Sequence, residues 1–150
     1  MDADRSRAVS QERTDLKHRD LTDAILKVFY DVYNELGHGF LESVYEEALA
    51  IALREAGLAV RQQVPLQVWF RGHKVGVFVA DLVIENIVIL ELKAARALEP
   101  AHEAQLLDEL RATEIEIGLL LNFGPTPQFK RLVFGNERKK TPNSAGKGAG

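Results

Sequence analysis

The 150-residue chain contains no cysteine. This absence excludes a disulfide framework, a thiolate metal site and a cysteine nucleophile, and it fits a reducing cytoplasm. The sequence also lacks an apolar run long enough to act as a signal peptide or to span a bilayer, and it opens with the polar stretch MDADRSRAVSQERTD. We therefore expect a soluble cytoplasmic protein that has no membrane partner.

Several catalytic signatures are missing as well. No glycine-rich loop has the spacing of a phosphate cradle, and no Ser-His-Asp arrangement stands out. The four histidines, His18, His38, His73 and His102, do not fall at zinc-site spacings. We interpret each histidine as an ordinary surface residue or helix-cap residue.

Positive charge is scarce over most of the chain. The net charge is −3, but residues 130–150 carry six Lys or Arg against Glu137, a local +5 that leaves −8 on the rest. An acidic body disfavours binding to a phosphate backbone unless a divalent metal or the basic segment around residues 138–140 compensates. A solvated tail is the simpler interpretation of that segment.

The length and the 46% content of hydrophobic residues suit one domain with a sizeable core. We expect a mobile leader over residues 1–19, a folded domain over 20–135 and a disordered basic tail over 136–150. Apolar residues recur at helical spacing over 21–36 and over 41–56, which predicts two adjacent amphipathic helices.

Beyond these helices the apolar period changes from 3.6 to 2, which predicts strands. Pro65 favours an edge position for the first strand. A strand, helix, strand order implies a right-handed crossover and a parallel pair, so the sheet is mixed. The expected elements are strands over 64–70, 75–84 and 87–93, a helix over 100–113 that buries Ala104, Leu106, Leu107 and Leu110, a strand over 117–121 and a short last strand over 129–134.

Three charged residues lie inside strands that are otherwise almost entirely Val, Ile and Leu. Asp81 belongs to the second expected strand, and Glu91 and Lys93 belong to the third. Side chains two positions apart on a strand point to the same face, so Glu91 and Lys93 share one face while Leu90 and Leu92 point to the other.

The connection between these two strands decides whether Asp81 joins Glu91. A two-residue turn pairs Ile84 with Ile87 and sends the carboxylate of Asp81 away from Glu91. A three-residue loop over 85–87, or a bulge, pairs Ile84 with Val88 and places Asp81 opposite Glu91. Only the second register builds a site, and we predict that register.

Two facing carboxylates about 5 Å apart repel each other by about 3 kcal/mol at an effective dielectric of 20. Lys93 offsets one charge, whereas a divalent cation offsets both and prefers hard oxygen ligands, so we expect Mg²⁺ or Mn²⁺. Such an ion makes bound water more acidic and polarises a phosphoryl oxygen, and a neighbouring lysine stabilises developing charge. A cross-strand salt bridge is the alternative, which the apolar surroundings disfavour because unpaired buried charges are costly.

Two further elements carry weaker signals. Glu42 and Tyr45 share one face of the second helix after Gly39, although Glu42 also suits a helix N-terminus and Tyr45 suits the core. Gln105 shares a helical face with Glu109, for which a solvated face is the default interpretation.

These residues together resemble a known family. The pattern formed by Gly39, Glu42 and Tyr45 is similar to the signature of the GxxExxY family, and Asp81 with the Glu91-Leu92-Lys93 stretch resembles the core of the PD-(D/E)xK nuclease superfamily, to which that family is assigned. The resemblance runs from about residue 21 to residue 134 and includes the AHEAQLL and LLLNFG stretches. It implies an α/β fold with a restriction-endonuclease-like core, a mixed sheet of four to five strands flanked by helices in the order α-α-β-β-β-α-β.

The resemblance also implies roles for individual residues. Asp81 and Glu91 would be catalytic metal ligands, Leu92 would add its backbone carbonyl, and Lys93 would be the catalytic lysine. Glu42 would be the helix carboxylate, as a direct ligand or one shell further out.

Other positions of the family pattern support or weaken this assignment. Gln105 matches the glutamine of a Q-x-x-x-Y motif that contacts substrate or site, and Tyr45 would support the site. Ala80 replaces the proline of the superfamily name, a tolerated variation. Glu109 replaces the tyrosine of the Q-x-x-x-Y motif, which removes an aromatic contact to nucleic acid and adds a negative charge.

The expected function is hydrolysis of nucleic-acid phosphodiester bonds by metal-activated water, with DNA favoured over RNA as the partner and Mg²⁺ or Mn²⁺ as the cofactor. The alternative is a catalytically silent nuclease-like module that binds nucleic acid or protein, docking through Trp69 and Phe70. Formation of a homodimer is a further possibility, because enzymes that cut both strands often pair two active sites.

Overall fold

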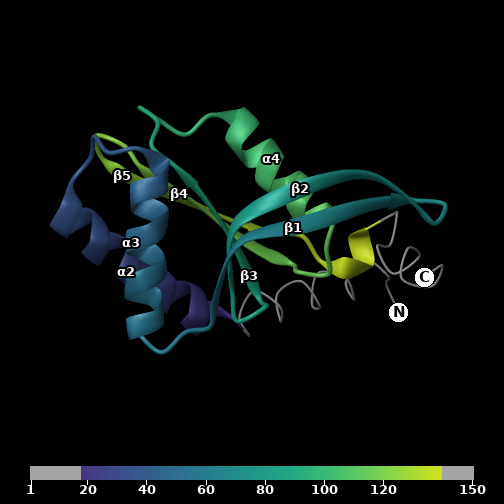
Figure 1. Cartoon of the computed structure of the whole chain (residues 1–150), viewed down its shortest axis with the longest axis horizontal. Coiled ribbons are helices and arrows are strands. Elements are labelled where there is room, and N and C mark those ends of the chain that lie inside the picture. The colour runs from purple at the N-terminus through teal and green to yellow at the C-terminus, as the bar shows by residue number, and fades with distance from the viewer. Residues whose placement is uncertain (1–17, 140–150) are drawn as a thin grey trace, which may run out of the picture.

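The computed structural model describes residues 18–139, so most of the expected leader and residues 140–150 lie outside the described part. The order of elements confirms the predicted α-α-β-β-β-α-β arrangement (Figure 1). The elements are α2 (Arg19–Leu36), α3 (Glu42–Glu55), β1 (Val60–Phe70), β2 (His73–Ile84), β3 (Val88–Lys93), α4 (Pro100–Arg111), β4 (Ile117–Phe123), β5 (Pro127–Val133) and the 3-10 helix η1 (Asn136–Arg138).

One five-stranded sheet runs in the order β1-β2-β3-β4-β5. Strands β3 and β4 are parallel and joined through α4, and the other neighbours are antiparallel, which confirms the mixed sheet. Pro65 lies on the edge strand β1, where its missing N–H costs no ladder hydrogen bond.

Helices cover both faces of the sheet, as Figure 1 shows with α2 and α3 on one side and α4 on the other. The face under α2 and α3 buries Leu90 and Leu92 of β3 against apolar residues of both helices. The opposite face buries Ile89 against Leu106 and Leu110 of α4. This alternation along β3 follows from the two-residue period of an extended strand.

The burial pattern of α4 differs from the predicted one. Leu106 and Leu110 are buried as expected, but Ala104 is exposed, Leu107 is 36% exposed and Glu109 is fully buried. The helix is therefore rotated so that Glu109, and not Leu107, turns toward the sheet. It begins with Pro100 in its first turn and a capping box in which the Glu99 N–H donates to His102 Nδ1 at 3.0 Å.

At Gln63 and Asp81, the buried side chains of the β1-β2 hairpin switch from one face of the sheet to the other. Leu82 packs under α2 and α3, whereas Ala80, two residues away, packs under α4. Neither Gln63 nor Asp81 is paired in the ladder, and Gln63 has a φ of 51°. Beyond this bend the hairpin projects away from α2 and α3 (Figure 1).

Residues 136–139 belong to the expected disordered tail but include the helix η1, and residues 140–150 of that tail lie outside the described part. Asn136 and Lys139 are packed against the α4-β4 connection, where Asn136 Nδ2 donates to the Glu114 carbonyl at 2.9 Å. Lys139 Nζ donates to the carbonyls of Thr113 at 2.6 Å and Ile115 at 3.0 Å. Burial lowers the pKa of Lys139 to about 8.

None of the helices between residues 18 and 139 has the length and apolar character that crossing a bilayer requires.

Candidate active site

The register between β2 and β3 is the one that we predicted. Ile84 pairs with Val88 and Leu82 pairs with Leu90, so the connection is a three-residue loop and not a two-residue turn. The ladder ends at Leu82 and Leu90, which means that β2 separates from β3 immediately before Asp81 reaches Glu91.

Asp81 spans the gap that opens between the two strands. Its Oδ2 accepts a hydrogen bond from the backbone N–H of Leu92 at 2.9 Å. The carboxylate thus satisfies a donor on β3 that a continuing strand would otherwise have paired. Asp81 is held at the edge of β3 because that strand still needs an acceptor there.

Glu91 lies on the α4 side of the sheet with only 1% of its surface exposed. Burial raises the pKa of Glu91 to about 12, and its contacts with Glu109 and Asp81 add to this rise. The contact with Asp81 places the two carboxyls together, as the register predicts. A buried acid this close to two others is strongly disfavoured as an anion unless a cation compensates.

Glu109 is the third carboxyl of this cluster, and its expected place on a solvated face was wrong. The side chain is fully buried against Glu91, because the rotation of α4 turns it toward β3. Burial raises the pKa of Glu109, although hydrogen bonds with Glu91 and Gln105 oppose the rise. Among the described residues, no donor outside the carboxyl pair itself reaches Oε1 of Glu91 or Oε1 of Glu109.

Lys93 and Gln105 continue the polar network. Lys93 Nζ donates to Gln105 Oε1 at 3.1 Å, and Gln105 Nε2 donates to Glu109 Oε2 at 3.3 Å. The amide of Gln105 therefore links the lysine to the buried acids. One continuous chain of contacts runs along Lys93, Gln105, Glu109, Glu91 and Asp81.

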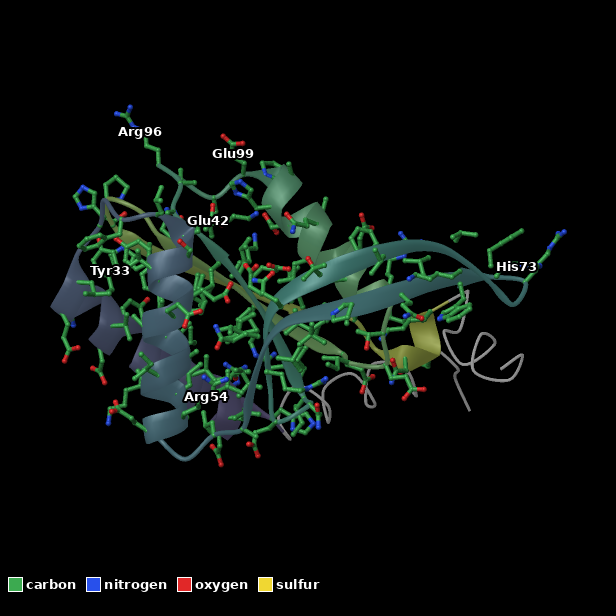
Figure 2. All side chains as sticks on the ribbon, viewed as in Figure 1. Tyr33, Glu42, Arg54, His73, Arg96 and Glu99 are labelled. Carbon is green, nitrogen blue, oxygen red and sulfur yellow. The ribbon has the colours of Figure 1, made fainter. Side chains whose placement is uncertain are left out.

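Glu42 lies in the first turn of α3 and is exposed (Figure 2). No hydrogen bond or ion pair joins it to the other residues that the structure describes. Glu46, one turn later, is closer to the cluster, because its Oε1 accepts from Gln63 Nε2 at 2.5 Å and the same Nε2 lies 3.5 Å from Asp81 Oδ1. Residues four positions apart share one face of a helix, so the spacing from Glu42 to Glu46 was the sequence feature that could have identified Glu46.

Tyr45, which we expected to support the site, is buried in the core on the α2 and α3 side of the sheet. Its hydroxyl donates to the Gly37 carbonyl at 2.6 Å and accepts from the Phe40 N–H at 3.2 Å. Its ring stacks on Phe123 with centroids 4.2 Å apart. Tyr45 thus fixes the loop between α2 and α3, and it does not reach the carboxyl cluster through any hydrogen bond among the described residues.

Asn122 is a supporting residue to which the sequence assigned no role. Its Oδ1 accepts from the Ala95 N–H and its Nδ2 donates to the Ala95 carbonyl, both at 2.9 Å. A Cβ on Gly124 would collide with that same carbonyl, so the close approach requires glycine. The segment that follows Lys93 is therefore clamped onto the end of β4.

The donor set fits a hexacoordinate ion that retains water. Among residues 18–139 no three His, Asp or Glu side chains form a complete metal site. Mg²⁺ is commonly held by one or two carboxylates and several waters, and Asp81 and Glu91 supply two. In a strand the N–H and C=O of one residue point to the same side, so the Leu92 carbonyl faces the gap that Asp81 enters. The unsatisfied buried oxygens of Glu91 and Glu109 are the charge that a cation would neutralise.

Comparison with known proteins identifies the superfamily of the chain. A family model described as the PD-(D/E)XK nuclease superfamily matches residues 19–132, and the chain belongs to that superfamily. Its α/β fold is consistent with the restriction-endonuclease-like core. Among solved structures, the crystal structure of SSO0001 is similar with a TM-score of 0.47 and 13% identity, covering 93% of this chain and 68% of that one. No curated protein matches the chain.

Replacing Asn122 tests the clamp on the segment after Lys93. Asn122→Ala leaves the N–H and carbonyl of Ala95 without their side-chain partners, so we expect the free energy of unfolding to fall by about 2 kcal/mol or more. Urea denaturation followed by circular dichroism measures this loss. Asn34→Ala, at an exposed position of α2, should change stability by less than about 0.5 kcal/mol. Equal stabilities of the two variants would argue against the clamp.

The raised pKa values of Glu91 and Glu109 predict how stability depends on pH without divalent metal. In the unfolded chain a glutamate loses its proton above its ordinary pKa of 4.5, whereas in the folded protein these two carboxyls keep theirs to higher pH. Raising the pH therefore favours the unfolded state, and the free energy of unfolding should fall as pH rises from about 5 to 8. Glu109→Gln removes one of these charges, and we expect it to raise the pH 8 stability by at least about 1 kcal/mol, or about 2–4 °C in Tm.

Thermal unfolding in EDTA at several pH values measures this difference. At pH 4.5 the Glu109→Gln variant and the unsubstituted protein should melt at similar temperatures. Glu35→Gln, at an exposed position of α2, serves as the matched control and should follow the unsubstituted protein at every pH. If the Tm of Glu109→Gln changes with pH in the same way as the Tm of the control, the coupling between burial and ionisation is refuted.

Proposed function

We propose that the chain is a Mg²⁺-dependent nuclease that hydrolyses nucleic-acid phosphodiester bonds by metal-activated water, with DNA as its first candidate substrate. The observation that carries this proposal is the convergence of Asp81 and Glu91 where β2 leaves β3, with Lys93 on the same strand. Membership in a superfamily of nucleases supports the same conclusion. The Gly39, Glu42 and Tyr45 pattern further supports assignment to the GxxExxY group.

In this proposal each residue of the cluster has a definite task. Asp81 and Glu91 would hold the ion, and the Leu92 carbonyl would add a third ligand from the same gap. When bound there, Mg²⁺ supplies positive charge for the phosphoryl oxygens and makes a bound water more acidic. Asp81 is already oriented for this task by the Leu92 N–H.

Lys93 provides the second positive charge. Its ammonium group is oriented by Gln105 and stabilises the negative charge that develops on the phosphate during attack. Glu109 holds the far end of the Gln105 amide and thereby orients Lys93 indirectly. Glu46 acts on Asp81 through Gln63, and Glu42, which is exposed, would contribute through water.

Isosteric substitutions test the nuclease assignment. Asp81→Asn, Glu91→Gln and Lys93→Met should each reduce metal-dependent cleavage by about 100-fold or more, because each removes charge that acts on the transition state. Cleavage of labelled single-stranded, duplex and branched DNA, and of single-stranded RNA, is measured with Mg²⁺ and with Mn²⁺. Glu35→Gln and Lys27→Met, at exposed positions of α2, are the matched controls and should retain full activity. Absence of metal-dependent cleavage of every substrate by the unsubstituted protein would contradict the assignment.

A catalytically silent module is the second candidate function. The observation that favours it is the third buried carboxyl, Glu109, which adds negative charge where the family pattern has tyrosine. Calorimetric titration with Mn²⁺ separates the two functions. A nuclease should bind the ion and lose the heat in Asp81→Asn, whereas a silent module has no reason to bind it.

A further inference from the structure

A groove of about 410 Å³ lies beside the candidate active site, between the projecting β1-β2 hairpin, α4 and the end of η1. Trp69, Phe70 and Phe78 supply aromatic walls, and Arg111 and Lys139 lie on the α4 and η1 sides. This volume falls within the range of small-ligand pockets, about 300–1,000 Å³. Nothing in the catalytic cluster uses these residues.

The groove exists because the hairpin bends away from the α2 and α3 face at Gln63 and Asp81. A second irregularity follows, where the register shifts between Val68 and Trp69. Apolar side chains along the groove remain uncovered, since Phe70 is 53% exposed and Val75 is 60% exposed. Exposed aromatic and aliphatic surface of this kind commonly marks a binding site.

The charges around the groove favour a polyanion over an apolar peptide. Arg111 and Lys139 line it, and the guanidinium of Arg71 lies 4.8 Å above the ring of Phe70. Among the lining residues the one acid is Asp108, which is paired with Arg111 at 3.6 Å. Lys139 is held by the carbonyls of Thr113 and Ile115 and faces Glu114, Glu116 and Glu137, so the arginines are the cations that favour a polyanion. Aromatic rings interleaved with Arg and Lys are typical of surfaces that stack unpaired bases and hold phosphates.

Helix α4 connects this groove to the carboxyl cluster. Gln105 and Glu109 belong to the cluster, whereas Arg111 and Ala112 line the groove. The rise from Gln105 to Ala112 is about 10 Å at 1.5 Å per residue.

We propose that this groove binds an unpaired base that follows the scissile phosphate along the strand, with the base stacked on Trp69 and a neighbouring phosphate held by Arg111. The substrate class is therefore nucleic acid with a single-stranded segment. The position relative to the scissile phosphate rests on the proposed nuclease function, whereas the binding of single strands by the groove does not.

The single tryptophan of the chain makes the groove directly observable. The full chain is titrated in EDTA, where no metal-dependent cleavage occurs, with a 12-nucleotide single-stranded DNA, a duplex of the same sequence and an apolar 12-residue peptide. We expect saturable quenching of Trp69 fluorescence by the single strand, with affinity that falls as salt rises. Quenching by the duplex alone, or by the peptide alone, overturns the proposal in favour of a double-stranded or a protein partner.

Substitutions in the groove are measured by the anisotropy of labelled single-stranded DNA. Trp69→Ala should weaken binding by at least about fivefold, whereas Trp69→Phe keeps a ring and should restore most of it. Arg111→Ala should reduce both affinity and its salt dependence. Val79→Ala on the same hairpin, outside the groove, should bind as the unsubstituted protein does.

These results separate the groove from the nuclease proposal. Equal binding by Trp69→Ala and Val79→Ala overturns the groove proposal even if cleavage is found. Strong single-strand binding that requires Trp69, in a protein that cleaves nothing, supports the groove while refuting the nuclease function. Thermal unfolding of each variant confirms that it is folded.

Discussion

The carboxyl group of Glu91 is buried against two other acids, so its ionisation is costly in free energy. The neighbouring residues are placed where they either raise or offset that cost. Asp81 enters from the bend of the hairpin, and Glu109 enters from the inward face of α4. Lys93 is the nearest compensating charge, but it reaches the acids through the amide of Gln105. A divalent cation would relieve this repulsion, because it neutralises more charge than the single lysine can.

The separation of β2 from β3 makes room for that cation. If the ladder continued past Leu82 and Leu90, backbone hydrogen bonds would fill the gap. Instead, Asp81 satisfies the Leu92 N–H and keeps the strand edge polar. The same departure carries the hairpin outward, so one backbone irregularity produces both the carboxyl cluster and the groove beside it.

The two faces of the sheet have different tasks. On the face of α2 and α3, Tyr45 and Phe123 form a packed support that fixes the loop before α3. At the end of β4, Asn122 clamps the segment that follows β3. On the opposite face, α4 supplies polar groups to the carboxyl cluster at one side and Arg111 to the groove at the other. The cluster and the groove thus both lie on the face that carries α4.

Local periodicity was enough to predict the order of elements and the mixed sheet. It left two registers open between the second and third strands, because a one-residue slip inverts the face of a strand, and the register that brings Asp81 to Glu91 was predicted because only that register builds a site. The facing of α4 was beyond such reasoning. Gln105 and Glu109 share a polar stripe that suits solvent as well as a buried site, and only packing against β3 selects the second. Likewise, the four-residue spacing places Glu42 and Glu46 on one face of α3, but which of the two approaches Asp81 depends on the position of Gln63 in the folded hairpin.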